Sequence, residues 1–369
     1  MRRVLCTCCF VLFCAGVSLA QSAEKPAKTS ERWNHALSKP LPTDKMGPFI
    51  RLSNQDILTV HDTEAFVSPD EGKTWTSRAL FKAGQNFKVS KERALLRTRK
   101  GTLVLLFLNM ADQKWGWDSE KNQPIEGIQA NVWVARSFDE GKTWPELQLV
   151  QKGYCGAVRD LIQTREGNLV FVAQDMVPKL ARSITQTYLS KDDGASWQAS
   201  NILDLGGRGH HDGTIEGTLE ELKDGRLWLL VRTNLDRFWE AFSEDGGLTW
   251  RVFRPSQIGA SSSPGMLKRL KIGRLVLIWN QLYPEGQASF ERRGGVWSNP
   301  AGSWHREELS IAFSEDEGRS WSQPVVFTKE PRKWLSYAYL FEASPGNLWV
   351  TTMQGEVRLQ LREGDFLAR

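Results

Sequence analysis

Charged side chains interrupt several short apolar runs of the sequence, and these interruptions are the first places where chemistry is expected. Arg159 and Asp160 stand inside the run from Ala157 to Ile162. Glu216 and Arg232 lie in two further runs of the same kind. An ionised side chain inside an apolar strand is costly unless it is paired or used. We therefore take these four residues as candidates for ligand binding or catalysis.

A polar loop, Arg208 to Gly213, stands directly before the stretch that holds Glu216, which places it at the mouth of the same site. Its His210, His211 and Asp212 are residue types that can bind a metal ion. Adjacent ligands on one loop without a remote partner make a weak metal site, however. We expect His211 and Asp212 to contact a substrate, and we predict neither a metal nor another cofactor.

One eight-residue pattern, Ser-x-Asp-x-Gly-x-Thr/Ser-Trp, occurs five times along the chain. The copies begin at Ser68, Ser137, Ser190, Ser243 and Ser314. Their spacing of roughly 50 to 70 residues is the period of propeller blades. An Asp carboxylate accepts backbone N–H bonds within a hairpin turn, and Gly supplies the positive φ that the turn needs. We therefore interpret the five aspartates as structural and not as catalytic or metal-binding groups.

The segments around each copy predict the strands that must position the candidate residues. Each repeat has an apolar stretch, a Gly-containing turn, a second apolar stretch, a short alternating strand, the motif and a fourth strand. The expected first strands begin near Phe49, Ala94, Ala157, Thr214, Met266 and Tyr337. The sequence thus predicts an all-β fold, a six-bladed β-propeller of four-stranded antiparallel blades, that occupies residues 46–369 as one domain.

The first 45 residues differ in character from the repeats. Residues 1–20 have a basic start, an apolar middle and a small-residue end at Ala20, the pattern of a secretory signal peptide. Residues 21–45 form a polar segment that we interpret as an N-terminal tail. These features predict export to the periplasm or the extracellular space, with no membrane span in the mature protein.

Cysteine usage and net charge limit the remaining possibilities. Only Cys155 lies beyond the predicted cleavage site, so we expect no disulfide within the mature chain. The formal net charge is +5, from 48 basic and 43 acidic residues. No long basic run is present, which argues against a nucleic-acid partner and is compatible with small anionic ligands.

The five motifs resemble the Asp boxes, or bacterial neuraminidase repeats, of sialidases, whose propellers also have six blades. The resemblance covers nearly all of the predicted mature chain. It implies an exo-acting glycoside hydrolase that removes terminal sialic acid or a related acidic sugar from a glycan or glycoconjugate. In that family a neutral Tyr, polarised by a Glu base, is the nucleophile, an exception among glycosidases. Three arginines bind the substrate carboxylate.

The resemblance can be carried over residue by residue. Ile215-Glu216 is followed by a Gly turn and then by Arg232, which matches the family's Glu base and second arginine. Arg306 stands three residues before a Leu that leads into an Asp box, as the third arginine does. Tyr337 opens the final blade, as the nucleophile does, and Tyr339 lies on the same side of that strand.

The first arginine and the acid/base residue match the family less closely. Arg51 stands one position away from the family's order, and Arg93 and Arg97 are alternatives. The family's acid/base Asp lies in a long loop of the first blade, where this sequence has only a tight turn with Asp62. The alternative carboxylic acids for this role are Asp112, Asp118 and Glu126, in the longer loop from Met110 to Gln129, and Asp160. Asp62 is the candidate by position.

Two other functions stay open at this point. The short first-blade loop is compatible with a hydrolase of the same superfamily that acts on a different sugar. A propeller without catalytic activity that binds glycans or proteins is the second alternative. Trp115 and Trp117, in the loop from Met110 to Gln129, suit stacking on a sugar face in any of these cases.

Overall fold

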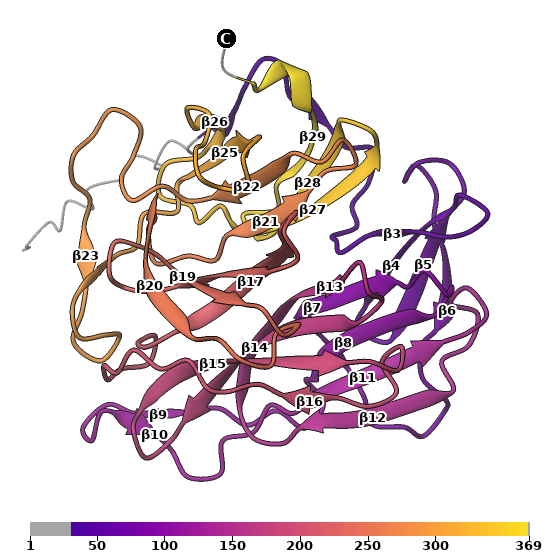
Figure 1. Cartoon of the computed structure of the whole chain (residues 1–369), viewed down its shortest axis with the longest axis horizontal. Coiled ribbons are helices and arrows are strands. Elements are labelled where there is room, and N and C mark those ends of the chain that lie inside the picture. Colours follow the sequence, from indigo (N-terminus) through magenta and orange to yellow (C-terminus); the bar gives the residue numbers. More distant parts are fainter. Residues whose placement is uncertain (1–30, 368–369) are drawn as a thin grey trace, which may run out of the picture.

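The computed structural model of the protein describes residues 31–367. Six antiparallel sheets stand around a ring, and each sheet is one blade (Figure 1). The described residues contain no α-helix, and a single 3-10 turn lies at Glu363–Asp365. The predicted six-bladed β-propeller is therefore confirmed. Within residues 31–367, no helix has the length and apolar character needed to cross a membrane.

Blades one to four each consist of four strands in chain order, and their first strands lie next to one another around the inside of the ring. Blade one comprises β3 (Ile50–Arg51), β4 (Ile57–His61), β5 (Glu64–Ser68) and β6 (Thr76–Ala79). Blade two comprises β7 (Val89–Arg97), β8 (Leu103–Asn109), β11 (Val132–Ser137) and β12 (Glu146–Gln151). Blade three comprises β13 (Cys155–Gln163), β14 (Leu169–Val177), β15 (Arg182–Ser190) and β16 (Gln198–Ala199). Blade four comprises β17 (Ile215–Glu221), β18 (Leu227–Arg232), β19 (Arg237–Ser243) and β20 (Val252–Gly259).

The last two blades take strands from both ends of the chain. Blade five comprises β21 (Met266–Arg269), β22 (Leu275–Trp279), β25 (Glu308–Ser314) and β26 (Val325–Lys329), with β1 (Trp33–Asn34) paired to β26. Blade six comprises β27 (Ser336–Ser344), β28 (Asn347–Gln354) and β29 (Arg358–Arg362), with β2 (Lys39–Pro40) paired to β29. Part of the predicted tail therefore closes the ring. The predicted signal peptide, residues 1–20, lies outside the described residues and stays a prediction.

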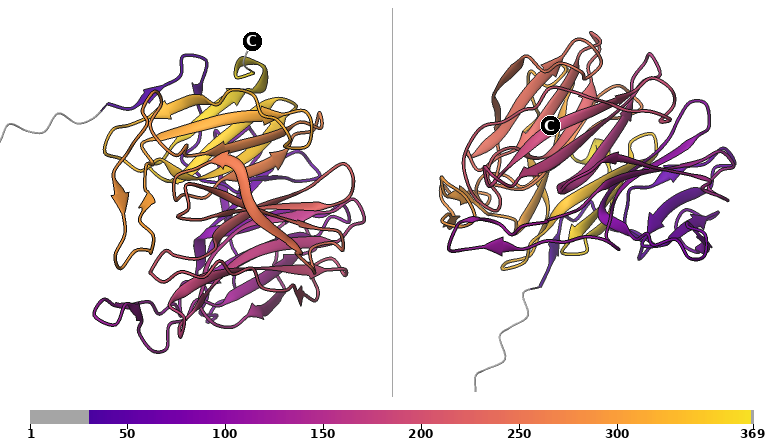
Figure 2. Two further views of the ribbon diagram at one scale, coloured as in Figure 1. Left: turned by 60° about the vertical axis from the view of Figure 1, so that its left-hand side comes forward. Right: turned by 90° about the horizontal axis from the view of Figure 1, so that it is seen from below.

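Two short hairpins protrude from the same face of the ring (Figure 2). One is β9 (Trp117–Asp118) with β10 (Gln123–Pro124), inserted between β8 and β11. The other is β23 (Arg292–Arg293) with β24 (Gly302–Ser303), inserted between β22 and β25. The connection before β17 joins both insertions, because Arg208 donates to the carbonyl oxygen of Lys121 and the N–H of His211 donates to that of Trp297.

Each Asp box is a hairpin turn closed by its own polar groups. In blade three the Ser190 hydroxyl donates to Asp192 at 2.8 Å, and the N–H of Ser196 donates to the same carboxylate at 2.8 Å. The N–H of Gly194 donates to the Ser190 hydroxyl at 2.8 Å. The same three bonds recur in the other four copies. The structural interpretation of these aspartates is confirmed.

Apolar side chains fill the space between each pair of neighbouring blades. Six buried clusters occur in the described chain, and each draws its residues mainly from two adjacent sheets. Trp144 and Trp250, from the second and fourth Asp boxes, are buried in two of them. Since no cluster spans the whole ring, every blade depends on both neighbours for its burial, and the position of each inner strand depends on ring closure.

We expect Asp192→Ala to lower the free energy of unfolding by about 1–3 kcal/mol, because its hydroxyl and N–H partners lose a charged acceptor. Urea unfolding followed by circular dichroism measures the loss. Glu244→Ala, at a variable position of the fourth motif, is the matched control and should change stability little. Equal losses in the two variants would contradict the structural role of the motif aspartates.

Candidate functional site

Two residues near the starts of inner strands have backbone conformations that are rare for their types. Glu216, the second residue of β17, has φ +45°, and Tyr337, the second residue of β27, has φ +62°. Left-handed conformations of non-glycine residues cost about 1–3 kcal/mol and cluster at functional sites. Both residues are buried. The strained backbone is therefore the first structural sign of a site at this end of the blades.

The side chains of these two residues meet across the ring. The Tyr337 hydroxyl donates to Glu216 Oε1 at 2.7 Å. Arg232, at the end of β18, donates through Nη1 to Glu216 Oε2 at 2.6 Å and lies 3.4 Å from the Tyr337 oxygen. Blades four and six thus contribute one chain of hydrogen bonds, which unites three residues that the sequence predicted separately.

Arg306, two residues before the start of β25, joins the group from blade five. Its guanidinium lies 4.7 Å from the ring centroid of Trp304, 4.9 Å from that of Trp334 and 5.6 Å from that of Tyr337. It donates to the Ser262 carbonyl oxygen at 2.6 Å, while the Ser262 hydroxyl accepts a bond from Arg232 Nε at 3.0 Å. Ser262 therefore ties the two arginines together. Nothing in its Ser-rich sequence context indicated this role.

Arg159 and Asp160 have separate functions in the structure. The Arg159 guanidinium lies 5.0 Å from the ring centroids of both Tyr337 and Tyr339, so it belongs to the group. The Asp160 carboxylate instead accepts bonds from the Thr218 hydroxyl at 2.7 Å and from the backbone N–H of residue 219 at 3.0 Å. Asp160 therefore joins β13 to β17, and its predicted contact with substrate is corrected to a structural role.

Buried nitrogen atoms in each of the three arginines of this group have no hydrogen-bond partner among the described residues. They are Nε and Nη1 of Arg159, Nη2 of Arg232 and Nε of Arg306, and outside the group Nε of Arg93 and of Arg358 is also unpaired. Buried polar groups are almost always paired, so a cluster of free donors indicates a missing acceptor. Guanidinium groups match the planar geometry of a carboxylate. The arrangement is suited to an anionic ligand beside Tyr337.

The charges around the pair set its protonation state. Burial raises the pKa of Tyr337 to about 12, and the negative charge of Glu216 acts in the same direction. Burial alone would also raise the pKa of Glu216, but the charge and hydrogen bond of Arg232 bring this pKa below its ordinary value. Burial, followed by the charge of Arg232, lowers the pKa of Arg306 to about 10. At neutral pH the group thus holds a carboxylate, a neutral phenol and cationic arginines.

Arg51 lies at the other end of its blade. Its guanidinium forms an ion pair of 2.9 Å with Glu71, in the first Asp box, and so it stands on the side of the ring opposite the Tyr337 hydroxyl. The prediction that Arg51 belongs to the site is therefore corrected. Arg97 makes the equivalent ion pair with Glu140. Arg93 is buried nearer the site, but it donates to the carbonyl oxygen of Gly47 at 2.8 Å.

Asp62 does not reach the hydrogen-bonded group. Its side chain is 70% exposed in the tight turn between β4 and β5, and its carboxylate lies 3.9 Å from the Lys88 ammonium. Of the alternatives in the long loop, Asp118 accepts the backbone N–H bonds of its own turn, and Glu126 is exposed. One buried carboxylate oxygen of Asp112 has no hydrogen-bond partner among the described residues. The predicted acid/base role of Asp62 therefore finds no support in the geometry.

The loop before β17 is built around Asp212. Its carboxylate accepts backbone N–H bonds from Arg208 at 2.9 Å, Gly213 at 2.8 Å and Asn299 at 2.8 Å. The Asp212 carboxylate therefore stabilises the loop. Its predicted contact with substrate is corrected to this structural role. Among the described residues, no three His, Cys, Asp or Glu side chains are grouped as metal ligands.

Aromatic rings line the loops beside the arginines. His211 stacks on Trp297 with ring centroids 5.1 Å apart and lies 5.2 Å from Trp304, which in turn contacts Arg306. Trp115 and Trp117 pack against His210 at 5.0 and 5.3 Å. The two loop Trp residues and His211 thus belong to one half-buried aromatic band that leads to the arginine group.

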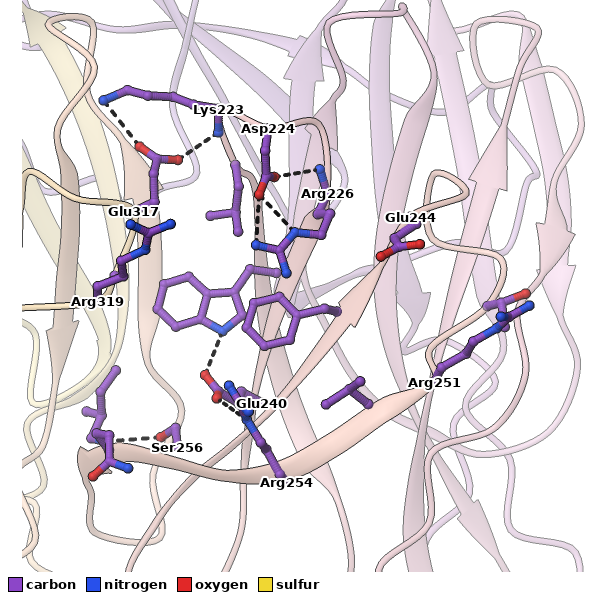
Figure 3. A pocket seen from close by; sticks show the side chains of 18 of the residues that line it. Lys223, Asp224, Arg226, Glu240, Glu244, Arg251, Arg254, Ser256, Glu317 and Arg319 are labelled. Carbon is purple, nitrogen blue, oxygen red and sulfur yellow. Dashed lines mark hydrogen bonds and ion pairs between the residues drawn. The ribbon is translucent and has the colours of Figure 1, made fainter.

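A separate groove of about 1050 Å³ lies along β18, β19 and β20 and shares no residue with this group (Figure 3). Several of its charged side chains pair with one another, as Lys223 does with Glu317 at 3.3 Å and Arg254 does with Glu240 at 2.8 Å. None of the unpaired arginine donors of the Tyr337 group lies in this groove.

One family model and two curated sialidases match this chain in sequence. A family model described as a BNR repeat-like domain matches residues 60–350. A sialidase of Vibrio cholerae is 24% identical over 229 residues, which cover 58% of this chain and 27% of that protein. A sialidase of Bacteroides fragilis is 24% identical over 292 residues, covering 73% and 50%. The chain thus spans half or less of the length of these relatives.

Solved structures share the fold at low sequence identity. The NanB sialidase of Streptococcus pneumoniae superposes with a TM-score of 0.58 at 12% identity, covering 90% of this chain and 70% of that one. A Penicillium chrysogenum α-L-arabinanase superposes with a TM-score of 0.55 at 14% identity, covering 92% and 100%. The family model, the two related sialidases and the six-bladed fold together show that the chain belongs to the BNR repeat-like family of the sialidase superfamily.

Proposed function

We propose that the protein is an exo-acting glycoside hydrolase of the sialidase type, which releases terminal sialic acid or a related acidic sugar with retention of configuration. The observation that carries this proposal is the 2.7 Å bond from the Tyr337 hydroxyl to Glu216, surrounded by three arginines with unpaired donors. A phenol beside an ionised carboxylate has a base ready to take its proton. The free arginine donors supply a place for the carboxylate of an acidic sugar.

The charge of such a substrate explains the choice of a tyrosine. Sialic acid carries a carboxylate on its anomeric carbon, and an anionic nucleophile approaching that carbon would be repelled. Tyr337 approaches it neutral, because its pKa is raised to about 12. As its oxygen bonds to the anomeric carbon and the glycosidic C–O bond breaks, its proton passes to Glu216 Oε1, and Arg232 keeps Glu216 positioned for that transfer. The departing oxygen takes a proton from an acid. The product of this step is a glycosyl–tyrosine intermediate that water then hydrolyses.

Arg159, Arg232 and Arg306 form the proposed carboxylate clamp. Arg159 takes the place that the sequence resemblance assigned to Arg51, from blade three instead of blade one. The half-buried band formed by Trp115, Trp117 and His211 lies on the side of the remaining sugar chain. Rings of this kind stack on sugar faces.

The relatives favour this substrate without defining it. Both matched curated relatives are named sialidases, and NanB is a sialidase of the same fold. The arabinanase shows that a propeller of this shape also acts on another sugar. Neutral glycosides therefore belong in the test. The predicted export of the chain would bring it to glycoconjugates outside the cytoplasm.

The mature protein should cleave a fluorogenic sialoside and leave neutral glycosides and a uronide intact. Glu216→Gln should lower kcat for the sialoside by about 100- to 10,000-fold, because Tyr337 loses its base. A thermal unfolding curve checks that the variant is folded. Cleavage of a neutral glycoside alone, or full activity of folded Glu216→Gln, would overturn the proposal.

Arg159→Gln tests the clamp. We expect its KM for the sialoside to rise by about 10- to 100-fold, since a charge-assisted bond to the substrate carboxylate contributes roughly 1.5–3 kcal/mol. Arg51→Gln is the matched control, because Arg51 pairs with Glu71 on the opposite side of the ring. If Arg51→Gln raised KM and Arg159→Gln did not, the clamp would have to be reassigned to blade one.

A further inference from the structure

The inner strands of blades two, three and four share an irregularity. In β7 the pairing with β8 shifts between Val89 and Arg93, and in β13 the pairing with β14 shifts at Arg159. In β17 the pairing with β18 shifts at Glu216. β-Bulges turn side chains toward active sites and are frequent beside them. Two of the three bulges therefore present residues of the site, and the third presents Glu92.

The backbone on both sides of Glu92 is held by blade six. The Tyr339 hydroxyl lies 2.8 Å from the Lys91 carbonyl oxygen, and it accepts a bond from the N–H of Arg93 at 3.0 Å. The Arg93 guanidinium donates to the Gly47 carbonyl oxygen of the segment that leads into blade one. Tyr339 shares a strand face with Tyr337. The β7 bulge is thus fixed to the same strand that carries the proposed nucleophile.

The carboxyl of Glu92 lies within electrostatic range of the site. Electrostatic effects connect its carboxyl to charged or titratable groups on blades three, four and six and on its own strand, namely Arg159, Glu216, Tyr154, Cys155, Tyr337, Tyr339 and Arg93. Groups on three other blades can act on one carboxyl only where the blades converge. Glu92 forms no ion pair with another residue of the described chain, and it is half-buried.

Burial raises the pKa of Glu92 to about 7, and the negative charge of Glu216 acts in the same direction, while Arg159 opposes it. A large share of molecules therefore carries a protonated Glu92 near neutral pH. Two other candidate carboxyls lack this combination: Asp62 is mostly exposed, and Asp160 is bound to Thr218. The leaving oxygen in the proposed reaction needs a proton, which a protonated Glu92 can give.

We propose that Glu92 is the general acid and base of the reaction, an inference that rests on the proposed function. Glu92 gives its proton to the glycosidic oxygen as that C–O bond breaks and as the Tyr337 oxygen bonds to the anomeric carbon. The Tyr337 proton goes to Glu216. In the second step ionised Glu92 takes a proton from water, whose oxygen displaces Tyr337, and Glu216 returns its proton to the tyrosine. Both carboxyls end in their starting states.

Leaving groups of different basicity test this role. A nitrophenolate leaves without protonation, whereas the hydroxyl of a second sugar needs an acid. Glu92→Gln should lower kcat/KM for a sialyl-linked disaccharide by about 100- to 10,000-fold and that for the nitrophenyl sialoside by less than about ten-fold. Glu92→Asp, which keeps a shorter carboxyl, should lie between the wild type and Glu92→Gln for the disaccharide.

The pH profile gives a second measurement. An acid must be protonated to act, so wild-type kcat/KM for the disaccharide should fall as pH rises through about 7, the pKa of Glu92. Tyr337 and Arg306 titrate much higher, at about 12 and about 10. This alkaline limb should be absent in Glu92→Gln. Asp175→Asn is the matched control: burial also raises the pKa of Asp175, to about 6, but no charge of the site acts on it.

The activities of the wild type and of Glu92→Gln on the two substrates test the role of Glu92 separately from the proposed function. A wild-type protein that cleaves neither sialoside would overturn both. An active wild type whose Glu92→Gln variant loses activity equally on both substrates, or on neither, would overturn the role of Glu92 alone. Retention of the alkaline limb in Glu92→Gln, or its loss in Asp175→Asn, would do the same.

Discussion

The hydrogen bond between the Tyr337 hydroxyl and Glu216 is the interaction on which the rest of the site depends. It joins the first strands of blades four and six, which are not neighbours in the ring, and Arg232 and Ser262 extend it toward blade five. Its geometry is therefore set by the closure of the whole propeller. That closure includes β2, which comes from the start of the described chain and completes blade six against β29.

Positive charge in this group exceeds what its carboxyls compensate. Three buried or stacked guanidinium groups surround one ionised carboxylate, and several of their donors have no partner. Burying charge in this way is costly, as is the left-handed backbone of Glu216 and Tyr337. The burial of apolar side chains in the clusters between blades offsets these unfavourable free energies, since each blade is buried on both sides. An acidic ligand would complete the missing bonds, which links the stability of the site to its proposed substrate.

The sequence predicted the fold because the Asp box is a local turn that repeats with the blade. The same register placed Glu216, Arg232 and Tyr337 at the ends of strands that meet. The prediction for Arg51 was wrong because the position of its side chain in space does not follow from the repeat. Strand β3 contributes only two residues, and Arg51 lies at its far end beside an Asp box. Glu92 escaped notice because a bulge, which alternation of residue types does not reveal, directs it inward. The strands β1 and β2 are too short to show a period of two residues.

The proposed mechanism requires a covalent bond between Tyr337 and the sugar. Fluorine beside the anomeric carbon of a sialic acid derivative slows both steps, whereas a good leaving group speeds the first step alone. The intermediate therefore accumulates and can be detected by mass spectrometry of the digested protein. One added fluorosialyl group is expected on the peptide that contains Tyr337, and none in Tyr337→Phe. An adduct on another residue, or an active wild type that never forms one, would contradict this mechanism.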